Sequence, residues 1–299
     1  MGRMKGFAVA VMALVGLLAL AAGAVNVMGG RKLSRTYPIP EITTPGIPTD
    51  AATIARGEHI VRAVGVCADC HGPDLGGKVA MDAGLIGTIV APNLTRGKGG
   101  IGNHFTDEDW IRALRYGLRK DGTSLLLMPS ESYTHLSRAD LFAAIAYLKQ
   151  IPPVDRELPP TRIRTLGRAL IAAGRLPLLV AELTPRVEQP DDVPVTPTAE
   201  YGAYLASVGG CKSCHGPDLA GGIVVGPPGT PPTANLTPAG LAGWTEADFF
   251  RAMREGARPD GSPINDFMPW RLMASMTDDE LRALWAYLQT VPPLETPAR

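Results

Sequence analysis

The chain of 299 residues contains the same pattern twice, and this internal repeat limits the folds that it can adopt. Cys67-x-x-Cys-His-Gly-Pro-Asp-Leu75 recurs as Cys211-x-x-Cys-His-Gly-Pro-Asp-Leu219. Further matching segments follow in the same order in both copies: Asn93-Leu-Thr95 with Asn235-Leu-Thr237, Thr106-Asp-Glu-Asp-Trp110 with Thr245-Glu-Ala-Asp-Phe249, Met128-Pro129 with Met268-Pro269, and Ala146-Tyr-Leu148 with Ala286-Tyr-Leu288. The repeat predicts two related domains of roughly a hundred residues each.

Both copies predict the same helices, so the expected fold class is all-α. A Thr or Ser followed by acidic residues marks a capped helix N-terminus, and this pattern begins helices expected at 106–116, 137–149, 245–255 and 277–289. Shorter helices are expected at 53–64 and 199–208, and no run shows convincing strand alternation. The predicted organisation is a domain at 53–154 and a domain at 198–294, with linkers at 31–52 and 155–197 and a tail at 295–299.

The first thirty residues form a separate segment. Arg3 and Lys5 precede a run from Gly6 to Gly30 that has no charged residue. This run can cross a bilayer as one helix, which needs ~20 apolar residues. A signal sequence is the alternative, but the run exceeds the roughly 7–15 apolar residues of such signals. We therefore expect 1–30 to be a transmembrane anchor. The positive start stays inside, which places the later domains on the periplasmic side of a bacterial cytoplasmic membrane.

The linker at 155–197 contains a basic amphipathic stretch from Arg162 to Glu182. We expect a linker helix that packs on the first domain. The alternative is a surface that touches the membrane or a partner subunit.

The spacing of the cysteines and histidines indicates their chemistry. Four cysteines form two Cys-x-x-Cys pairs, and a histidine follows each pair at once. A thioredoxin-like redox site would need a βαβ surround, a zinc site would pool the four cysteines, and simple disulfides would leave the adjacent histidines unexplained. Haem c attachment explains all six residues, because the thiols form thioethers while the histidine reaches the iron. The sequence thus predicts two covalently bound haem c groups, attached through Cys67, Cys70, Cys211 and Cys214, with iron ligands His71 and His215.

The second axial ligand of each iron is expected to be a methionine. His215 is the only histidine in the second repeat, which excludes bis-histidine ligation within that domain. Met128 and Met268 are the methionines that the two repeats share, and each precedes a proline in a segment without helical pattern. They follow the proximal histidines by 57 and 53 residues, enough chain to return across the open haem face. We expect Met128 and Met268 as ligands, with His104 and His135 as alternatives in the first repeat.

With these residues in place, the sequence resembles class I cytochrome c domains over about 53–154 and 198–294. More narrowly, four segments are similar to the membrane-bound dihaem and trihaem cytochrome c subunits of bacterial alcohol and sugar-acid dehydrogenases: Ala91-Pro-Asn-Leu-Thr95, Gly100-Ile-Gly102, Thr106-Asp-Glu-Asp-Trp110 and Asp121-Gly122. In that family the cytochrome subunit takes electrons from a catalytic dehydrogenase and passes them to ubiquinone or a terminal oxidase. This chain departs from the alcohol dehydrogenase subunits, which carry three haems and often a C-terminal membrane segment.

The resemblance also implies roles for residues outside the cysteine motifs. Pro92 fits the family's proline whose carbonyl accepts a hydrogen bond from the proximal histidine, and Ala234 has the matching place in the second repeat. Gly57 and Gly202 resemble the small residue at which the first helix of the domain crosses the last.

The expected function is therefore electron transfer without a catalytic residue. A membrane-anchored dihaem cytochrome would carry single electrons between a periplasmic or membrane donor and a respiratory acceptor. Its partners would be a dehydrogenase, a quinol-oxidising complex or a terminal oxidase, as a subunit of a membrane complex. The 29 basic and 29 acidic residues balance, so nucleic acid is not an expected partner. The alternative is a dihaem enzyme, peroxidase-like or thiosulfate dehydrogenase-like, but the latter enzymes use a cysteine ligand and all four cysteines are assigned to haem attachment.

Overall fold

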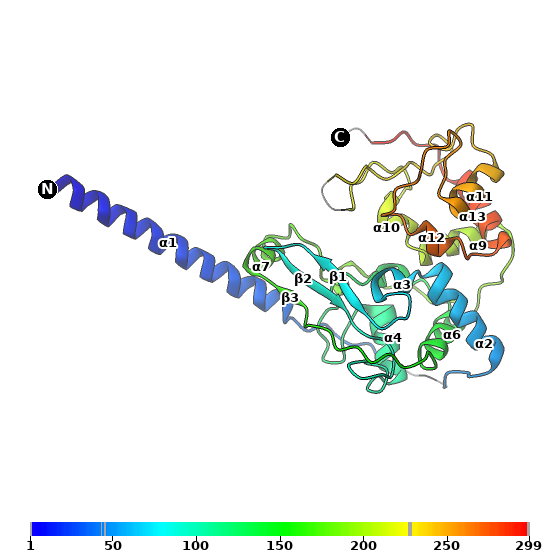
Figure 1. The fold of residues 1–299 in the computed structure, drawn as a ribbon, viewed down its shortest axis with the longest axis horizontal. Helices are drawn as coiled ribbons and strands as arrows, with labels where there is room; N and C mark the ends of the chain where they lie inside the picture. The colour runs from blue at the N-terminus through cyan, green and yellow to red at the C-terminus, as the bar shows by residue number, and fades with distance from the viewer. Residues whose placement is uncertain (1, 43, 45, 227–228, 298–299) are drawn as a thin grey trace.

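A long helix projects from a body of two helical domains in the computed structural model, which describes residues 2–42, 44, 46–226 and 229–297 (Figure 1). This helix is α1 (Gly2–Leu33). Within it, Gly6–Leu33 contains an 18-residue stretch with a mean hydropathy of 2.5, none of which is buried. Its length and composition are sufficient for one membrane crossing.

The two repeats form two domains with matching helices. Domain 1 contains α2 (Ala51–His59), the π-helical turn η1 (Ile60–Val64), α3 (Cys67–His71), α4 (Asp107–Tyr116), α5 (Ser130–Tyr133) and α6 (Arg138–Leu148). Domain 2 contains α9 (Ala199–Val208), α10 (Cys211–His215), α11 (Glu246–Glu255), α12 (Trp270–Met273) and α13 (Asp278–Thr290). The predicted N-caps are confirmed, because the side chains of Thr106, Ser137, Thr245 and Thr277 each accept a hydrogen bond from the backbone three residues later.

The first and last helices of each domain cross in close contact. A Cβ atom at Gly57 of α2 would overlap the carbonyl oxygen of Ala143 in α6. A Cβ atom at Gly202 of α9 would overlap the carbonyl oxygen of Ala283 in α13. Only glycine permits this approach, so the expected role of Gly57 and Gly202 is confirmed.

The π-helical turn in domain 1 accommodates a difference in length between the repeats. Gly57 precedes Cys67 by ten residues, whereas Gly202 precedes Cys211 by nine. A π-turn is an α-helix with one residue inserted. Because η1 absorbs that residue, the cysteine motif keeps the same relation to the helix crossing in both domains.

The expected all-α class is wrong in one region, since domain 1 also contains a small antiparallel sheet. Its strands β1 (Lys78–Asp82), β2 (Gly87–Ala91) and β3 (Arg162–Ile163) are ordered β1-β2-β3. Buried and half-buried residues alternate along β2, but five residues are too few to separate a strand from a loop in the sequence. The third strand comes from the linker, and no local pattern indicates such a distant pairing.

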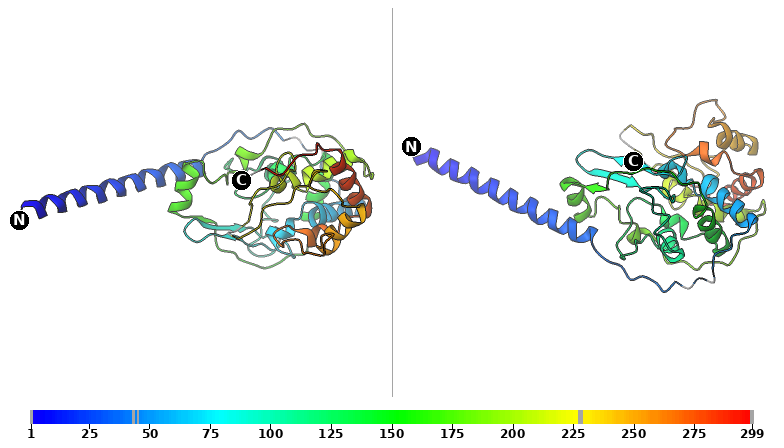
Figure 2. Two further views of the ribbon diagram at one scale, coloured as in Figure 1. Left: turned by 90° about the horizontal axis from the view of Figure 1, so that it is seen from above. Right: turned by 60° about the horizontal axis from the view of Figure 1, so that its bottom comes forward.

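The basic stretch from Arg162 to Glu182 does not form one linker helix. It is divided into β3, α7 (Thr165–Ala172) and α8 (Val180–Leu183). The stretch packs on domain 1, as expected, through β3 and through a bridge between Leu126 and Leu179. Helix α7 also lies beside the C-terminal end of α1, as Figures 1 and 2 show.

One continuous hydrophobic core joins the two domains. Val61 and Tyr133 of domain 1 belong to the same buried cluster as Val208 and Met273 of domain 2. The domains are therefore packed against each other rather than only tethered by the linker.

Candidate haem-attachment sites

Helices α3 and α10 place the cysteines and histidine of each motif on a single turn. Cys67 and Cys70 lie in α3, and Cys211 and Cys214 lie in α10; none of these four cysteines forms a disulfide. Burial raises the pKa of the Cys67 thiol to about 12 and that of the Cys211 thiol to about 11. Four uncharged thiols, paired at the spacing of one helical turn, fit thioether attachment to two porphyrins.

Each motif histidine is oriented by a backbone carbonyl. The Nδ1 atom of His71 lies 2.9 Å from the carbonyl oxygen of Pro92, and that of His215 lies 2.8 Å from the carbonyl oxygen of Ala234. A carbonyl oxygen can only accept, so Nδ1 carries the proton and donates it. Burial lowers the pKa of both rings, which favours the neutral imidazole. The lone pair then resides on Nε2, where an iron ligand requires it.

The loop that supplies the Pro92 carbonyl is held by a buried amide. Asn93 Nδ2 donates to the Val154 carbonyl oxygen at 2.7 Å, and Asn93 Oδ1 accepts from the Thr95 amide at 2.9 Å. Asn235 makes the corresponding bonds to Leu294 and Thr237, also at 2.7 and 2.9 Å. The repeated Asn-Leu-Thr segment was visible in the sequence, but its role in positioning the histidine acceptor was not predicted. Its exact recurrence after each cysteine motif was the available signal.

Met128 and Met268 occupy equivalent loops in the two domains. Each methionine is half-buried against the core and precedes a proline that forms the N-cap of a short helix, α5 or α12. Among the alternatives in domain 1, His104 is exposed and His135 is half-buried. The assignment of Met128 and Met268 as iron ligands stays a prediction.

The two candidate attachment sites adjoin across the domain boundary. The Ser213 hydroxyl, between the cysteines of α10, lies 3.2 Å from the Ser132 hydroxyl and 3.4 Å from a carboxylate oxygen of Glu131, both in α5 of domain 1. Burial raises the pKa of Cys214, and the charges of Glu131 and Asp69 raise it further. Asp69 itself lies between the cysteines of α3. The cysteine segment of one domain therefore faces that of the other.

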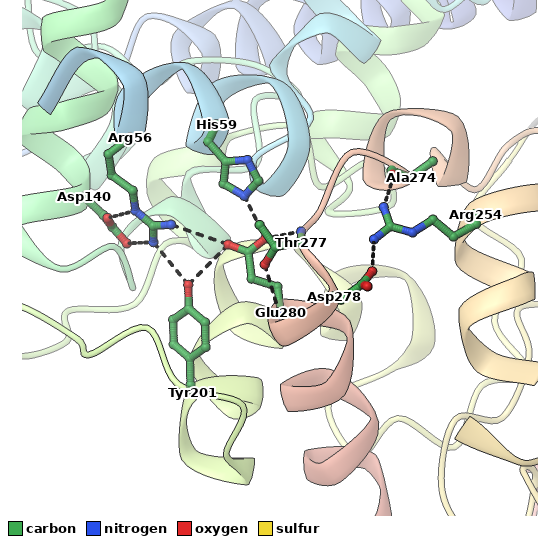
Figure 3. Close-up of polar contacts among 9 residues, drawn as sticks. All are labelled: Arg56, His59, Asp140, Tyr201, Arg254, Ala274, Thr277, Asp278 and Glu280. Carbon is green, nitrogen blue, oxygen red and sulfur yellow. Dashed lines mark hydrogen bonds and ion pairs between the residues drawn. The ribbon is translucent and has the colours of Figure 1, made fainter. Parts of the chain in front are cut away.

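A buried polar network fixes this arrangement of the domains (Figure 3). Arg56 of α2 makes two bonds to Asp140 of its own domain, at 2.8 and 2.9 Å, and a third to Glu280 of domain 2 at 3.4 Å. His59 Nε2 lies 2.7 Å from the second oxygen of Glu280. The Glu280 side chain is only 1% exposed. His59 is thus an interdomain contact.

The interface is approximately symmetric. Asp140 and Glu280 occupy the third position of equivalent helices, and His59 and Tyr204 each lie two residues after the crossing glycine. Tyr204 donates to Asp140 at 2.6 Å across the boundary, just as His59 contacts Glu280. The two domains therefore contact each other through equivalent positions, as the subunits of a twofold dimer do.

Family models match both domains. Residues 199–292 match the sequence model of cytochrome c, and residues 52–148 match that of subunit III of cbb3-type cytochrome c oxidase. The chain is 28% identical to the cytochrome c subunit of alcohol dehydrogenase (quinone) from Gluconacetobacter polyoxogenes, over 91% of this chain and 61% of the relative. It is 29% identical to the fructose dehydrogenase cytochrome subunit of Gluconobacter japonicus, over 83% of this chain and 55% of the relative.

A shorter match, 32% identical, links the chain to a diheme cytochrome c-type protein of Cereibacter sphaeroides, over 33% of this chain and 38% of that protein. The chain spans about six tenths of the alcohol dehydrogenase subunit and just over half of the fructose dehydrogenase subunit. Those relatives are electron-transfer components of dehydrogenases rather than catalytic subunits. With the duplicated cysteine and histidine geometry, these matches identify two cytochrome c domains in tandem, in a chain similar to the cytochrome c subunits of alcohol and fructose dehydrogenases.

Proposed function

We propose that this chain is a membrane-anchored dihaem c-type cytochrome that transfers single electrons from a dehydrogenase to a respiratory acceptor. The observation that carries the proposal is the twofold occurrence of one arrangement. In each domain, a pair of undisulfided cysteines adjoins a buried histidine whose Nδ1 atom is fixed by a carbonyl, so that Nε2 is available to iron. Haem c bound there supplies a one-electron Fe(III)/Fe(II) couple.

The residues of the chain set how such a centre behaves. The carbonyls of Pro92 and Ala234 hold the imidazoles in one tautomer and orientation. Met128 and Met268 would supply the second ligand of each iron, and a thioether ligand would favour the reduced state and raise the potential. An iron held by both a histidine and a methionine would have no position for peroxide or substrate, which favours electron transfer over an enzymatic reaction.

The contact between the attachment segments supports passage of electrons through the chain. Ser213 of one cysteine motif lies against Glu131 and Ser132, directly after the Met128 loop of the other domain. One domain can then receive an electron from a donor while the other delivers it, without separation of the domains.

The anchor is proposed to be α1, with both domains on the periplasmic side of a bacterial cytoplasmic membrane. Its apolar span and exposed side chains support this assignment. The dehydrogenase partner is proposed because cytochrome subunits of alcohol and fructose dehydrogenases match more than four fifths of this chain.

The proposed ligands can be tested one domain at a time. The purified chain should contain two haems by alkaline pyridine titration, and its oxidised spectrum should show the weak red absorption band of methionine-ligated ferric haem. Met128→Leu and Met268→Leu should each remove part of this band, lower one of the two reduction potentials and allow carbon monoxide to bind one reduced haem.

Met276→Leu is the matched control, because Met276 is a core residue with 3% exposure. It should leave the band and both potentials unchanged. A band of undiminished intensity in Met128→Leu would assign the ligand of domain 1 to another residue. Carbon monoxide binding by the unaltered chain, followed by turnover with peroxide, would replace electron transfer with an enzymatic function.

A further inference from the structure

The junction between α1 and the domains is rich in basic residues. Residues 26–40 and 159–187 contain eight Arg and Lys residues and a single acid, Glu182. The whole chain, by contrast, has a net charge of zero. The positive charge is therefore concentrated where the apolar helix meets the folded body.

Helix α7 is held against the last turns of α1 by specific contacts. The Arg168 guanidinium donates to the Asn26 side-chain oxygen at 3.4 Å, and Lys32 Nζ donates to the Ile171 carbonyl oxygen at 3.3 Å. At Gly29 the two backbones approach so closely that a Cβ atom would overlap the Arg168 carbonyl. These contacts fix the height of α7 along α1, and Figures 1 and 2 show α7 beside that end of the helix.

The length of the apolar run places this contact at the membrane surface. Phe7 to Val25 spans roughly 28 Å at the helical rise of about 1.5 Å per residue, close to the ~30 Å hydrocarbon thickness of a bilayer. Asn26 is the first polar residue after that run. Helix α7, which packs on Asn26 and on the two turns that follow, therefore lies at the level of the lipid headgroups.

The side chains exposed around α7 suit that level. Arg162, Arg164 and Arg175 flank the helix and are exposed. Within the described part of the chain, none of the three has a carboxylate within 4.0 Å. Leu166, 46% exposed, and Leu170 lie one turn apart on a single face of α7. An exposed leucine between arginines that have no acidic partner is typical of a helix that lies in a membrane interface.

The only acid of the region does not cancel this charge. Glu182 is engaged by Lys32 at 3.8 Å and by Arg35 at 3.6 Å, and it accepts a hydrogen bond from Tyr37 at 2.8 Å. A cavity of about 190 Å³ opens beside this group and is lined by Lys32, Glu182 and apolar residues such as Leu176.

The charge on this side of α1 also runs against the usual topology bias. Lys and Arg next to a membrane helix are normally enriched on the cytoplasmic side. Yet Arg31, Lys32 and Arg35 follow the span on the side that we assign to the periplasm. Attraction to anionic headgroups would give these residues a function there.

We propose that the junction of α1 and α7 is a binding surface for anionic phospholipid headgroups, which holds the haem domains in a fixed orientation on the membrane. The proposal rests on the assignment of α1 as the anchor. Arg162, Arg164 and Arg175 contact the phosphates, and Leu166 enters the apolar boundary below them. Each basic residue near an anionic surface strengthens binding about fivefold.

The test uses the full-length haem-loaded chain in detergent, to which dioleoyl phosphatidylglycerol or dioleoyl phosphatidylcholine is added. Native mass spectrometry measures the lipid that stays bound. The unaltered chain should retain phosphatidylglycerol in preference to phosphatidylcholine. The variant R162Q/R164Q/R175Q should weaken phosphatidylglycerol retention at least about tenfold, and an unchanged haem spectrum would show that it is folded.

The matched control is R138Q/R271Q/R282Q, which removes three arginines that are 51%, 62% and 47% exposed elsewhere on the domains. It should stay within about twofold of the unaltered chain. Equal retention by the two triple variants, or equal retention of the two lipids by the unaltered chain, would overturn the lipid surface and leave the anchor intact. An intact mass that lacks residues 1–24 would instead overturn the anchor, and the lipid surface with it.

Discussion

Removal of the Arg56 guanidinium should destabilise the chain far more than removal of an arginine from an exposed ion pair. Arg56→Met keeps much of the apolar stem but leaves Asp140 and Glu280, 6% and 1% exposed at their side chains, without their shared cation. His59 and Tyr204 still contact the two carboxylates, but a tyrosine hydroxyl carries no compensating charge. Breaking a buried pair by removing one partner costs about 3–5 kcal/mol. For a chain of this size, that lowers the melting temperature by roughly 10 °C.

The matched control is Arg254→Met, because Figure 3 shows a similar pair within domain 2. Arg254 lies 2.7 Å from Asp278, but the two side chains are 31% and 62% exposed. An exposed pair contributes less than about 1 kcal/mol. Thermal unfolding followed by circular dichroism compares the two variants, and limited proteolysis of the 184–198 linker reports whether the domains separate. Equal melting temperatures in the two variants, with equal cleavage of the linker, would refute the idea that the network holds the domains together.

Three further predictions concern single residues. Burial opposes ionisation of Glu280, but hydrogen bonds from His59 and the Thr277 amide hold its pKa below the usual value. The ionised carboxylate therefore stabilises the folded chain fully above about pH 4.3, and this stabilisation is lost as the pH falls further. Glu280→Gln should therefore flatten the decline of the melting temperature between about pH 5 and pH 3; an unchanged slope would contradict this. Gly57→Ala should lower the free energy of unfolding by more than about 2 kcal/mol, because its Cβ atom meets a carbonyl oxygen, whereas Gly16→Ala, with no atom near, should have no measurable effect on chemical denaturation. Asn93→Ala removes the side-chain hydrogen bonds that hold the loop with the Pro92 carbonyl, the acceptor for His71. It should therefore shift the reduction potential of one haem, and that haem should lose its Fe–His spectroscopic signal sooner on acidification. Asn103→Ala, which removes one exposed hydrogen bond, should leave both reduction potentials unchanged.

The helices and the placement of the cysteines and histidine of each motif on one helical turn were predictable because their signals are local. The N-caps of α4, α6, α11 and α13 adjoin the helices that they begin, and a pair of prolines follows α6 and α13 within a few residues. The orientation of His71 by Pro92 was expected from the resemblance to the cytochrome c family, and the structure confirms that contact. Duplication of every signal in a second domain strengthened each prediction.

The contacts that the sequence did not predict join distant parts of the chain. Arg56 and Glu280 are 224 residues apart, and neither carries a local mark of its partner. The pairing of β2 with β3 was also not predicted from the sequence. Both strands are short, and β3 comes from the linker, far along the chain from β2. Such contacts depend on how folded segments pack against each other, and the sequence pattern within each segment does not indicate that packing.

The near-symmetric interface determines which domains pair with each other, within one chain or between chains. A second copy of domain 2, placed where domain 1 lies, would present Tyr201 at the position of Arg56 and Tyr204 at the position of His59. Both copies of Glu280 would then be buried with hydroxyl groups and no cation, which is strongly unfavourable. Because Arg56 occurs in domain 1 alone, domain 2 binds domain 1 in preference to a second copy of domain 2. A tandem protein that could otherwise exchange domains with its neighbours is thereby directed to close on itself.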